Sequence, residues 1–360
     1  MNQKIYSDFS KLKQILKKTN SKKIFLVTGK TSFEKSGAKN KLNKILNKNL
    51  KVKLFSEFSS NPKIKEINNG LKLFNKEKFD IIIAIGGGSA IDVAKAIKLF
   101  SKTNKPLVVL PTTAGSGSES TYFIVYYIGK EKQSKGERDV TLPNYVILDY
   151  ELLKSLPNKI MASAGIDALG QAIESYWSIY STEESKKYSK KAIKLLIKNL
   201  ENAVKNRDKK SLKKIQKGAN LAGKAINITK TTACHALAYP MTSYFGIPHG
   251  HAVGLTLGEM LKFNYGVSKK DCIDKRGPDY VKKMIFEISK IMRHKEPEEA
   301  GDKIYSLMEN IGLEVKLSDL DLKKKDLNII VKNGFNPERA GNNPRKLNKI
   351  GVRNILKKVY

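Results

Sequence analysis

Two glycine-rich segments each follow a short apolar run, an arrangement suited to phosphate binding. The run at residues 79–85 leads directly into Gly86–Ser89, and a helix is expected from about Ala90. Backbone N–H groups in such a turn can approach a pyrophosphate, and a helix N-terminus adds a favourable partial charge. One glycine triplet also suits an ordinary tight turn. However, residues 111–119 form a second segment rich in hydroxyls and glycine after another apolar run, so the pair indicates a dinucleotide-binding domain.

Histidine is scarce in this chain, with four residues in total, yet His235, His249 and His251 lie close together. A single histidine in an apolar helix is more often a core residue than a ligand. Further upstream, Asp167 and Gln171 are one helical turn apart and would share a helix face. Imidazole and carboxylate groups bind Zn²⁺ or Fe²⁺, whereas a neutral amide oxygen is a weaker donor.

Together these segments resemble the iron-containing alcohol dehydrogenase family over most of the chain, from about Phe25 to Arg345. The matching motifs are GGGSxxD at 86–92, PTTAGxGSE at 111–119, HALAxP…IPHG at 235–250 and NPR at 343–345. Residues 165–174 are similar to the family's GxDALxHAIE segment and depart from it at Gln171. The resemblance implies an α/β N-terminal doubly wound dinucleotide-binding domain, followed by an all-α C-terminal metal-binding domain. This is the fold shared with dehydroquinate synthase-like proteins.

The resemblance assigns a set of residues to the pyrophosphate loop and the surface beside the nucleotide: Gly87, Gly88, Ser89, Asp92, Thr112, Thr113 and Ser116. Asp92 is expected to brace the loop. Acidic residues are common near helix starts, so an exposed helix face is the alternative for Asp92 and Lys95.

The end of the first predicted strand bears on cofactor choice. Many NAD-preferring members of the family have an aspartate where this chain has Gly29, and such a carboxylate would bond the ribose 2′-OH and repel a 2′-phosphate. Its absence permits NADPH, and Lys30 could pair with the 2′-phosphate, although a lysine at a strand end is often simply solvated. We therefore predict NADP(H), with NAD(H) as the alternative.

By the same resemblance, Asp167, His235 and His249 hold one divalent metal ion, Fe²⁺ or Zn²⁺. The family usually has a histidine where this chain has Gln171. Two arrangements follow: a three-ligand site with extra water, or a four-ligand site with weak coordination by Gln171.

The resemblance implies that the metal polarises an aldehyde oxygen while the dihydronicotinamide delivers hydride. Tyr239 replaces a histidine often found near the nicotinamide and is a candidate proton donor, with core packing as the alternative. His251 is a second candidate for substrate contact or proton relay.

Residues 227–232 and Gln171 resemble the branch of the family that contains phosphonoacetaldehyde reductases. The predicted reaction is therefore reduction of phosphonoacetaldehyde to 2-hydroxyethylphosphonate. The candidate contacts for this anionic substrate, by motif position, are Lys230, Thr231, Thr232 and Arg345. Reduction of another small aldehyde, of the butanal or lactaldehyde type, is the first alternative. Less favoured are an NAD-dependent cyclase like dehydroquinate synthase and a non-catalytic basic binding protein.

The elements that must position these residues fall into two halves. Predicted strands at 23–27, 52–55, 80–85 and 107–110 alternate with helices at 10–18, 37–46, 66–74 and 90–100, which is typical of a parallel sheet. A hairpin-like excursion covers 121–148, and Leu156–Pro157 suggests a hinge. Helical periodicity then dominates, at 162–179, 186–205, 212–225, 281–292 and 302–311. We predict an NAD(P)-binding domain at 1–157 and a metal-binding catalytic domain at 158–360.

The formal net charge is +34, but the lysines are scattered along the chain as expected for solvated helix faces. No nucleic-acid motif is recognised, so no nucleic-acid partner is predicted, although a positive field would favour an anionic substrate. Two cysteines without CxxC spacing, no export signal in residues 1–23 and no apolar run of about 20 residues indicate a cytoplasmic protein without a membrane partner. A homodimer is possible.

Overall fold

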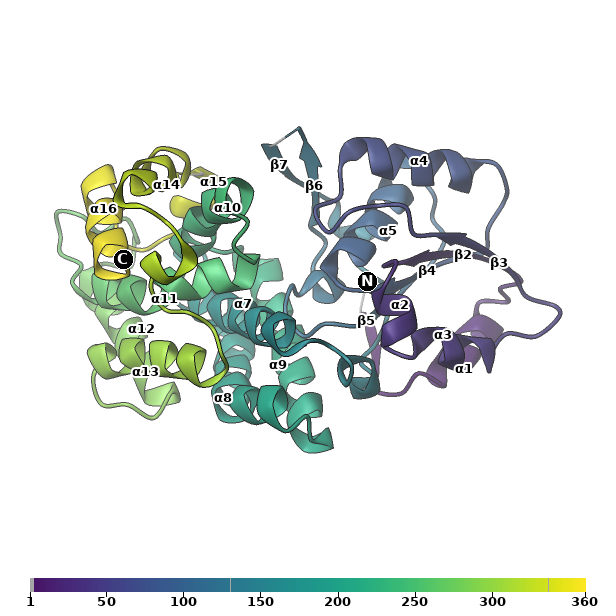
Figure 1. Ribbon diagram of the computed structural model, residues 1–360, viewed down its shortest axis with the longest axis horizontal. Helices are drawn as coiled ribbons and strands as arrows, with labels where there is room; N and C mark the ends of the chain where they lie inside the picture. The colour runs from purple at the N-terminus through teal and green to yellow at the C-terminus, as the bar shows by residue number, and fades with distance from the viewer. Residues whose placement is uncertain (1–2, 130, 336) are drawn as a thin grey trace. The chain divides into compact units, whose positions relative to one another are not determined.

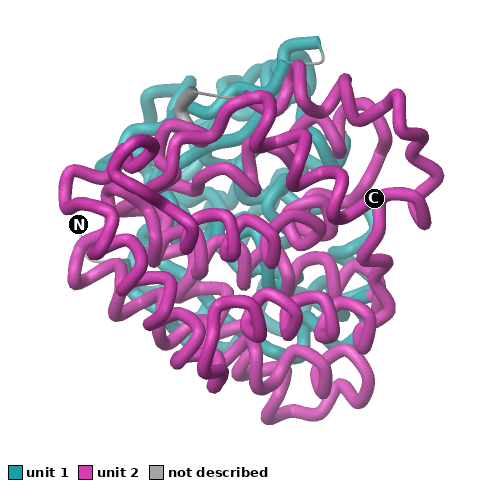
Figure 2. The backbone as a smooth tube through the Cα atoms, turned by 90° about the vertical axis from the view of Figure 1, so that its left-hand side faces the viewer, with its two compact units in different colours: residues 1–156 teal, residues 157–360 magenta. Residues whose placement is uncertain are grey.

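The computed structural model describes residues 3–129, 131–335 and 337–360. The chain divides into two compact units, residues 1–156 and residues 157–360, which are coloured separately in Figure 2. Each unit has its own layer architecture, and each is described by itself.

The first unit is built on a six-stranded parallel sheet (Figure 1) with strand order β1-β8-β5-β4-β2-β3. Its strands are β1 (Lys4–Tyr6), β2 (Lys23–Thr28), β3 (Lys51–Phe55), β4 (Ile81–Gly86), β5 (Leu107–Pro111) and β8 (Tyr145–Ile147). Every residue of β4 and β5 is buried, as expected for a parallel sheet covered on both faces. The four strands predicted from the apolar runs are confirmed, and β1 and β8 add to one edge.

Helices cover the sheet and create a core on each face. One core includes the rings of Phe25, Phe74 and Phe79, and the other includes Leu12 and Ile83. The helices of this unit are α1 (Lys11–Lys18), α2 (Ser32–Lys35), α3 (Ala38–Asn43), α4 (Ile64–Asn75), α5 (Gly88–Phe100) and α6 (Arg138–Thr141). A separate antiparallel hairpin, β6 (Ile124–Ile128) with β7 (Glu131–Lys135), lies within the predicted excursion.

The second unit is helical, with no strand among its described residues. Its helices are α7 (Asn158–Trp177), α8 (Glu183–Lys205), α9 (Lys209–Thr229), α10 (Ala233–Phe245), α11 (His249–Tyr265), α12 (Pro278–Ile291), α13 (Pro297–Asn310), α14 (Leu327–Asn333), α15 (Pro337–Ala340) and α16 (Lys349–Lys358). Helix α7 is buried from Gly165 to Trp177 and packs against α8, α9 and α11, so it is the central helix of this unit. The predicted order of an α/β half followed by an all-helical half is confirmed.

No helix in the described part of the chain combines the length and the apolar character needed to cross a membrane.

Candidate metal and cofactor site

Three of the four predicted metal ligands meet in the second unit. Asp167, His235 and His249 each offer a ligand atom, and these atoms all lie within 4.8 Å of one another. Asp167 comes from the middle of α7, His235 from the first turn of α10 and His249 from the first residue of α11. Asp167 and His235 are buried, and His249 is partly exposed. Residues far apart in the chain therefore form one compact group of an oxygen and two nitrogen donors.

A glycine allows this convergence, because it lets α11 approach α7 closely. A Cβ atom placed on Gly250 would lie 2.7 Å from the Cβ of Asp167 and still closer to the carbonyl oxygen of Ser163. No larger residue fits there without moving the backbone of α7. The contact between the two helices at Gly250 thus brings the neighbouring His249 to Asp167.

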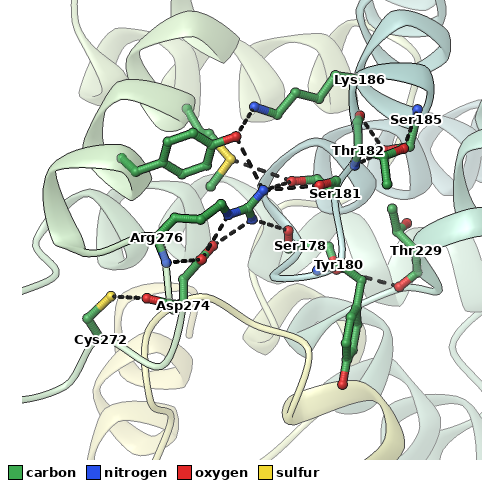
Figure 3. Close-up of polar contacts among 12 residues, drawn as sticks. Ser178, Tyr180, Ser181, Thr182, Ser185, Lys186, Thr229, Cys272, Asp274 and Arg276 are labelled. Carbon is green, nitrogen blue, oxygen red and sulfur yellow. Dashed lines mark hydrogen bonds and ion pairs between the residues drawn. The ribbon is translucent and has the colours of Figure 1, made fainter.

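The C-terminal end of α7 is held by Arg276, as Figure 3 shows. Its guanidinium donates hydrogen bonds to the carbonyl oxygens of Ser178 and Ser181, each at 3.0 Å, and pairs with Asp274 at 2.7 Å. The Ser178 hydroxyl also donates to the carbonyl of Thr229, at the end of α9. These bonds join the loop after α7 to the segments before α10 and α12.

Glu174 orients one of the ligands, and its role was not assigned from the sequence. This fully buried carboxylate bonds Nδ1 of His235, and it accepts hydrogen bonds from the Thr232 hydroxyl at 2.8 Å and the Cys234 amide at 2.7 Å. A carboxylate on Nδ1 leaves Nε2 directed at the ligand position, as is usual for metal-binding histidines. Glu174 follows Asp167 by two helical turns and Gln171 by one, so its place on the same face of α7 was a signal available in the sequence.

The electrostatics of the group favour a cation. Burial disfavours the charged form of His235, yet the negative charges of Glu174 and Asp167 and their hydrogen bonds raise the pKa of His235 to about 10. Nε2 of His235 is buried and lies 3.3 Å from Oδ1 of Asp167. A buried donor atom facing a carboxylate fits a site for a divalent ion, and one carboxylate with two imidazoles suits Fe²⁺ or Zn²⁺.

Gln171 lies beside this group. Its Nε2 donates to Oδ2 of Asp167 at 3.2 Å, which fixes the amide orientation, and its Oε1 is buried with no hydrogen-bond partner in the parts of the chain that are described. The amide oxygen is therefore available as a ligand.

In the first unit, the two glycine-rich segments lie side by side at the carboxyl ends of adjacent strands. Gly86 of β4 pairs with Pro111 of β5, and the Thr112 amide donates to the Gly86 carbonyl at 2.9 Å. A Cβ atom on Gly88 would lie 2.6 Å from Oγ of Ser116, so the loops approach closely only because residue 88 is glycine. The helix begins at Gly88, earlier than the predicted start near Ala90, because Gly87 is already its extended N-cap.

Asp92 and Lys95 do not lie on an exposed helix face, so that alternative was wrong. Both are buried in α5. Asp92 accepts hydrogen bonds from the Ser118 hydroxyl and the Val125 amide, while Nζ of Lys95 bonds the Ser118 hydroxyl and the Phe123 carbonyl, each at 3.0 Å. Burial raises the pKa of Asp92 and lowers the pKa of Lys95 to about 8. The two residues join α5 to the second glycine-rich segment and to β6.

The remaining predicted cofactor residues surround the same edge of the sheet. Gly29 follows β2 next to β4, and its amide nitrogen lies 3.3 Å from the position of a Cβ on Gly86. Lys30 is exposed, and the Ser89 hydroxyl donates to the carbonyl of Ser60. The buried hydroxyl of Thr112 has no hydrogen-bond partner among the described residues.

The predicted catalytic residues differ in their relation to the metal group. The ring of Tyr239 stacks on the His249 imidazole, with centroids 5.7 Å apart and an interplanar angle of 16°. His251 is buried, and its Nε2 bonds the Glu314 carbonyl at 2.6 Å; burial also lowers its pKa. Tyr239 therefore lies against a ligand, whereas the ring of His251 is engaged with a different segment.

The structure also brings together only some of the residues predicted to contact the substrate. Thr232 is fully buried between Glu174 and the Trp177 indole, and Thr231 and Lys230 precede it in the same connection. Arg345 is engaged elsewhere, because it pairs with Asp271 at 2.6 Å and stacks on the ring of Phe263. The structure thus does not bring Arg345 into this group of residues.

Comparisons with known proteins agree with this arrangement. The family model described as iron-containing alcohol dehydrogenase matches residues 5–150, and that described as Fe-containing alcohol dehydrogenase family, C-terminal, matches residues 161–360. The chain is 29% identical over 304 residues to phosphonoacetaldehyde reductase from Streptomyces viridochromogenes, covering 77% of this chain and 75% of that protein. It is 27% identical to NADPH-dependent butanol dehydrogenase from Clostridium saccharobutylicum, covering 99% and 96%.

Among solved structures, sulfoacetaldehyde reductase from Bifidobacterium kashiwanohense in complex with NAD⁺ matches with a TM-score of 0.88 and 28% identity, covering 99% of this chain and 96% of that one. Matched over both halves, the chain belongs to the iron-containing alcohol dehydrogenase family and is a metal-dependent, NAD(P)-linked oxidoreductase that acts on alcohol and aldehyde groups.

Proposed function

We propose that this protein reduces a small anionic aldehyde with NADPH, with one divalent metal ion bound by Asp167, His235 and His249. The observation that carries the metal assignment is the convergence of these three ligand atoms within 4.8 Å, from three different helices. A metal bound there would act as a Lewis acid on the aldehyde oxygen. Glu174 holds the His235 imidazole in the orientation that directs Nε2 to the ligand position.

The first unit would bind the cofactor through its two glycine-rich segments. Gly87, Gly88 and Ser89 offer backbone N–H groups at the N-terminus of α5, where a pyrophosphate is favoured. Asp92 and Lys95 hold the second glycine-rich segment in place through their bonds to the Ser118 hydroxyl. The absence of a carboxylate at Gly29 supports NADPH over NADH.

Tyr239 is the proposed proton donor to the alkoxide oxygen formed by hydride transfer. Its ring lies against His249, and its hydroxyl is the polar end of a partly buried side chain. His251 is the less favoured candidate, because its Nε2 is already bonded to the Glu314 carbonyl.

For the substrate we propose phosphonoacetaldehyde, reduced to 2-hydroxyethylphosphonate. Two of the relatives described above are named for aldehydes that carry an acidic group, phosphonoacetaldehyde and sulfoacetaldehyde. Butanal and lactaldehyde are the alternatives, since an NADPH-dependent butanol dehydrogenase and a lactaldehyde reductase are also among the relatives. Membership of the iron-containing alcohol dehydrogenase family argues against a cyclase like dehydroquinate synthase and against a non-catalytic basic binding protein.

The test is NADPH oxidation by metal-reconstituted protein with phosphonylated, phosphorylated and neutral aldehydes. His235→Ala should abolish turnover and metal retention while leaving NADPH binding within a few fold, because His235 lies in the helical unit. His294→Ala is the matched control, since His294 lies apart from the site and pairs with Glu299. Retained metal and turnover in His235→Ala would contradict the metal assignment, and much faster reduction of butanal or lactaldehyde would contradict the substrate.

A further inference from the structure

A groove of about 730 Å³ lies between α8 and α12 of the helical unit. None of the residues predicted to bind the metal, the cofactor or the substrate lines it. Its volume is in the range of sites that take small ligands. Six lysines line this cavity, which we call the lysine groove: Lys186, Lys187, Lys190, Lys194, Lys283 and Lys290.

The lysines form a row on each of the two helices. In α8, Lys186, Lys190 and Lys194 recur every four residues, so they follow one face of the helix. In α12, Lys283 and Lys290 are two helical turns apart. At a rise of about 1.5 Å per residue, the row on α8 extends over about 12 Å. The groove therefore presents a line of positive charge that is longer than a single anionic group.

This charge is not neutralised within the protein. No ammonium group of the lysine groove pairs with a carboxylate in the described part of the chain. Lys186 donates to the Tyr280 hydroxyl, and the carboxylate of Glu287 accepts a hydrogen bond from the Tyr176 hydroxyl at 2.8 Å. Like charges one turn apart on a helix repel and destabilise it. An anion bound between the two rows would remove this repulsion, so the arrangement favours a ligand with several negative charges.

The groups in the groove suit phosphates rather than nucleobases. A lysine ammonium binds phosphate as a point charge, whereas single-stranded nucleic acid is bound largely through bases that stack on aromatic rings. Lys186 lies over the rings of Tyr176 and Tyr280, 5.5 and 4.6 Å from their centroids. Arg276 also lies over the Tyr280 ring, at 4.4 Å. Both rings are thus engaged with cations, and contacts to phosphate are the basis of binding.

We infer that the lysine groove binds a linear chain of linked phosphate groups, at a site separate from that of the substrate. Such a chain carries its charges in a row, as the ammonium groups on α8 and α12 do. Inorganic polyphosphate and the phosphate tail of a nucleoside triphosphate share this chemistry. The inference does not rest on the reductase function, because no metal or cofactor residue lines the groove.

The test measures binding of inorganic triphosphate by calorimetry at low salt, with saturating NADP⁺ to fill the cofactor site. A triple variant, Lys190→Gln, Lys194→Gln and Lys283→Gln, should bind triphosphate about tenfold more weakly, because it loses three exposed charge contacts. These side chains are exposed, so the circular dichroism spectrum and the urea midpoint should not fall.

A matched control removes the same charge elsewhere. Lys210, Lys214 and Lys217 are exposed on one face of α9 and line none of the cavities described. Their replacement by Gln should leave the affinity within about twofold, because the long-range field changes little. Equal weakening in both triple variants would show that net charge alone attracts the anion and would overturn the inference. Absence of triphosphate binding to the unmodified protein would overturn it as well.

ATP separates the two sources of a phosphate chain. Binding of ATP no tighter than that of triphosphate favours the inorganic chain, since no ring in the groove is open for a base to stack on. Tenfold tighter binding of ATP, on the order of one stacked base, would overturn binding through phosphates alone. Groove-dependent binding of duplex DNA without binding of triphosphate would contradict the inference too.

A second measurement needs no variant. Acetylation of the unmodified protein, read by mass spectrometry, should be slowed by triphosphate at Lys190, Lys194 and Lys283. Acetylation at Lys210 and Lys214, which are equally exposed on α9, should proceed at the same rate with and without the ligand. Equal protection at the two sets of lysines would overturn a site in the groove.

Discussion

At the scale of single residues, the site departs from its family at Gln171. The structure shows how the amide that replaces the imidazole is placed beside Asp167. The amide nitrogen is bound to Asp167, and the amide oxygen is buried without a hydrogen-bond partner in the described chain. A buried acceptor left without a partner costs about 1–3 kcal/mol. A metal ion that accepted this oxygen as a fourth ligand would remove that penalty.

This argument gives a prediction for two substitutions. Gln171→His should tighten metal binding by about tenfold or more, because imidazole is a better donor than an amide for Zn²⁺ or Fe²⁺. Gln171→Ala should weaken binding if the amide coordinates, and should leave it unchanged if the site has three protein ligands. Titration of the apo-protein against a competing chelator measures both. Weaker metal binding in Gln171→His would show that this position cannot supply a ligand at all.

At the scale of elements, the site depends on how closely α11 packs on α7. Gly250→Ala would place a methyl group against Ser163 and Asp167, and the backbone atoms in contact cannot rotate away. We expect a loss of about 2 kcal/mol in the free energy of unfolding and weaker metal binding, because His249 is displaced from Asp167. Gly351→Ala in α16 is the matched control, since a Cβ there meets its nearest atom at 3.4 Å. Urea unfolding and metal content measure both effects, and a fully stable, metal-replete Gly250→Ala protein would contradict this role for the helix contact.

The elements also show which parts of the structure follow from sequence pattern. The strands β2, β3, β4 and β5 were predictable because each is a short apolar run bounded by polar residues, and the glycine motifs identify the turns after two of them. The hairpin excursion was predictable as a polar, hairpin-like segment, although its strand β7 has no apolar run. Helices α10 and α11, which carry His235 and His249, were not predicted, because they are buried and lack an amphipathic pattern.

Side-chain partners were harder to predict than elements. Burial of Asp92 and Lys95 depends on the covering hairpin, which brings Phe123 and Val125 to α5 from a distant part of the chain. Arg339 and Arg345 are close in sequence and of the same type, yet the first meets Tyr239 and the second meets Asp271. Only tertiary packing distinguishes the two, and motif position alone could not show that Arg345 bonds Asp271.

At the scale of the whole molecule, part of the excess positive charge is concentrated in one groove, while the rest is spread along the chain. A groove of about 730 Å³ between α8 and α12 contains six lysines, namely Lys186, Lys187, Lys190, Lys194, Lys283 and Lys290. Within the described chain, none of these lysines forms an ion pair with a carboxylate. The groove contains none of the predicted site residues, so its charge acts on a substrate only through the long-range field.

That field leads to a prediction about salt. With a net charge of +34, the protein should attract an anionic aldehyde at low ionic strength. The screening length falls from about 10 Å at 0.1 M salt to about 3 Å at 1 M, so kcat/KM for phosphonoacetaldehyde should fall several-fold over this range. The value for propanal should stay nearly constant, because a neutral molecule gains nothing from the field.

The same titration separates salt acting on the substrate from salt acting on the enzyme itself, because only the anionic aldehyde responds to the field. Steady-state rates with both aldehydes over one salt series give this comparison. An equal slope for propanal and phosphonoacetaldehyde would instead show that salt acts on the enzyme itself, and electrostatic attraction of the substrate would have to be abandoned.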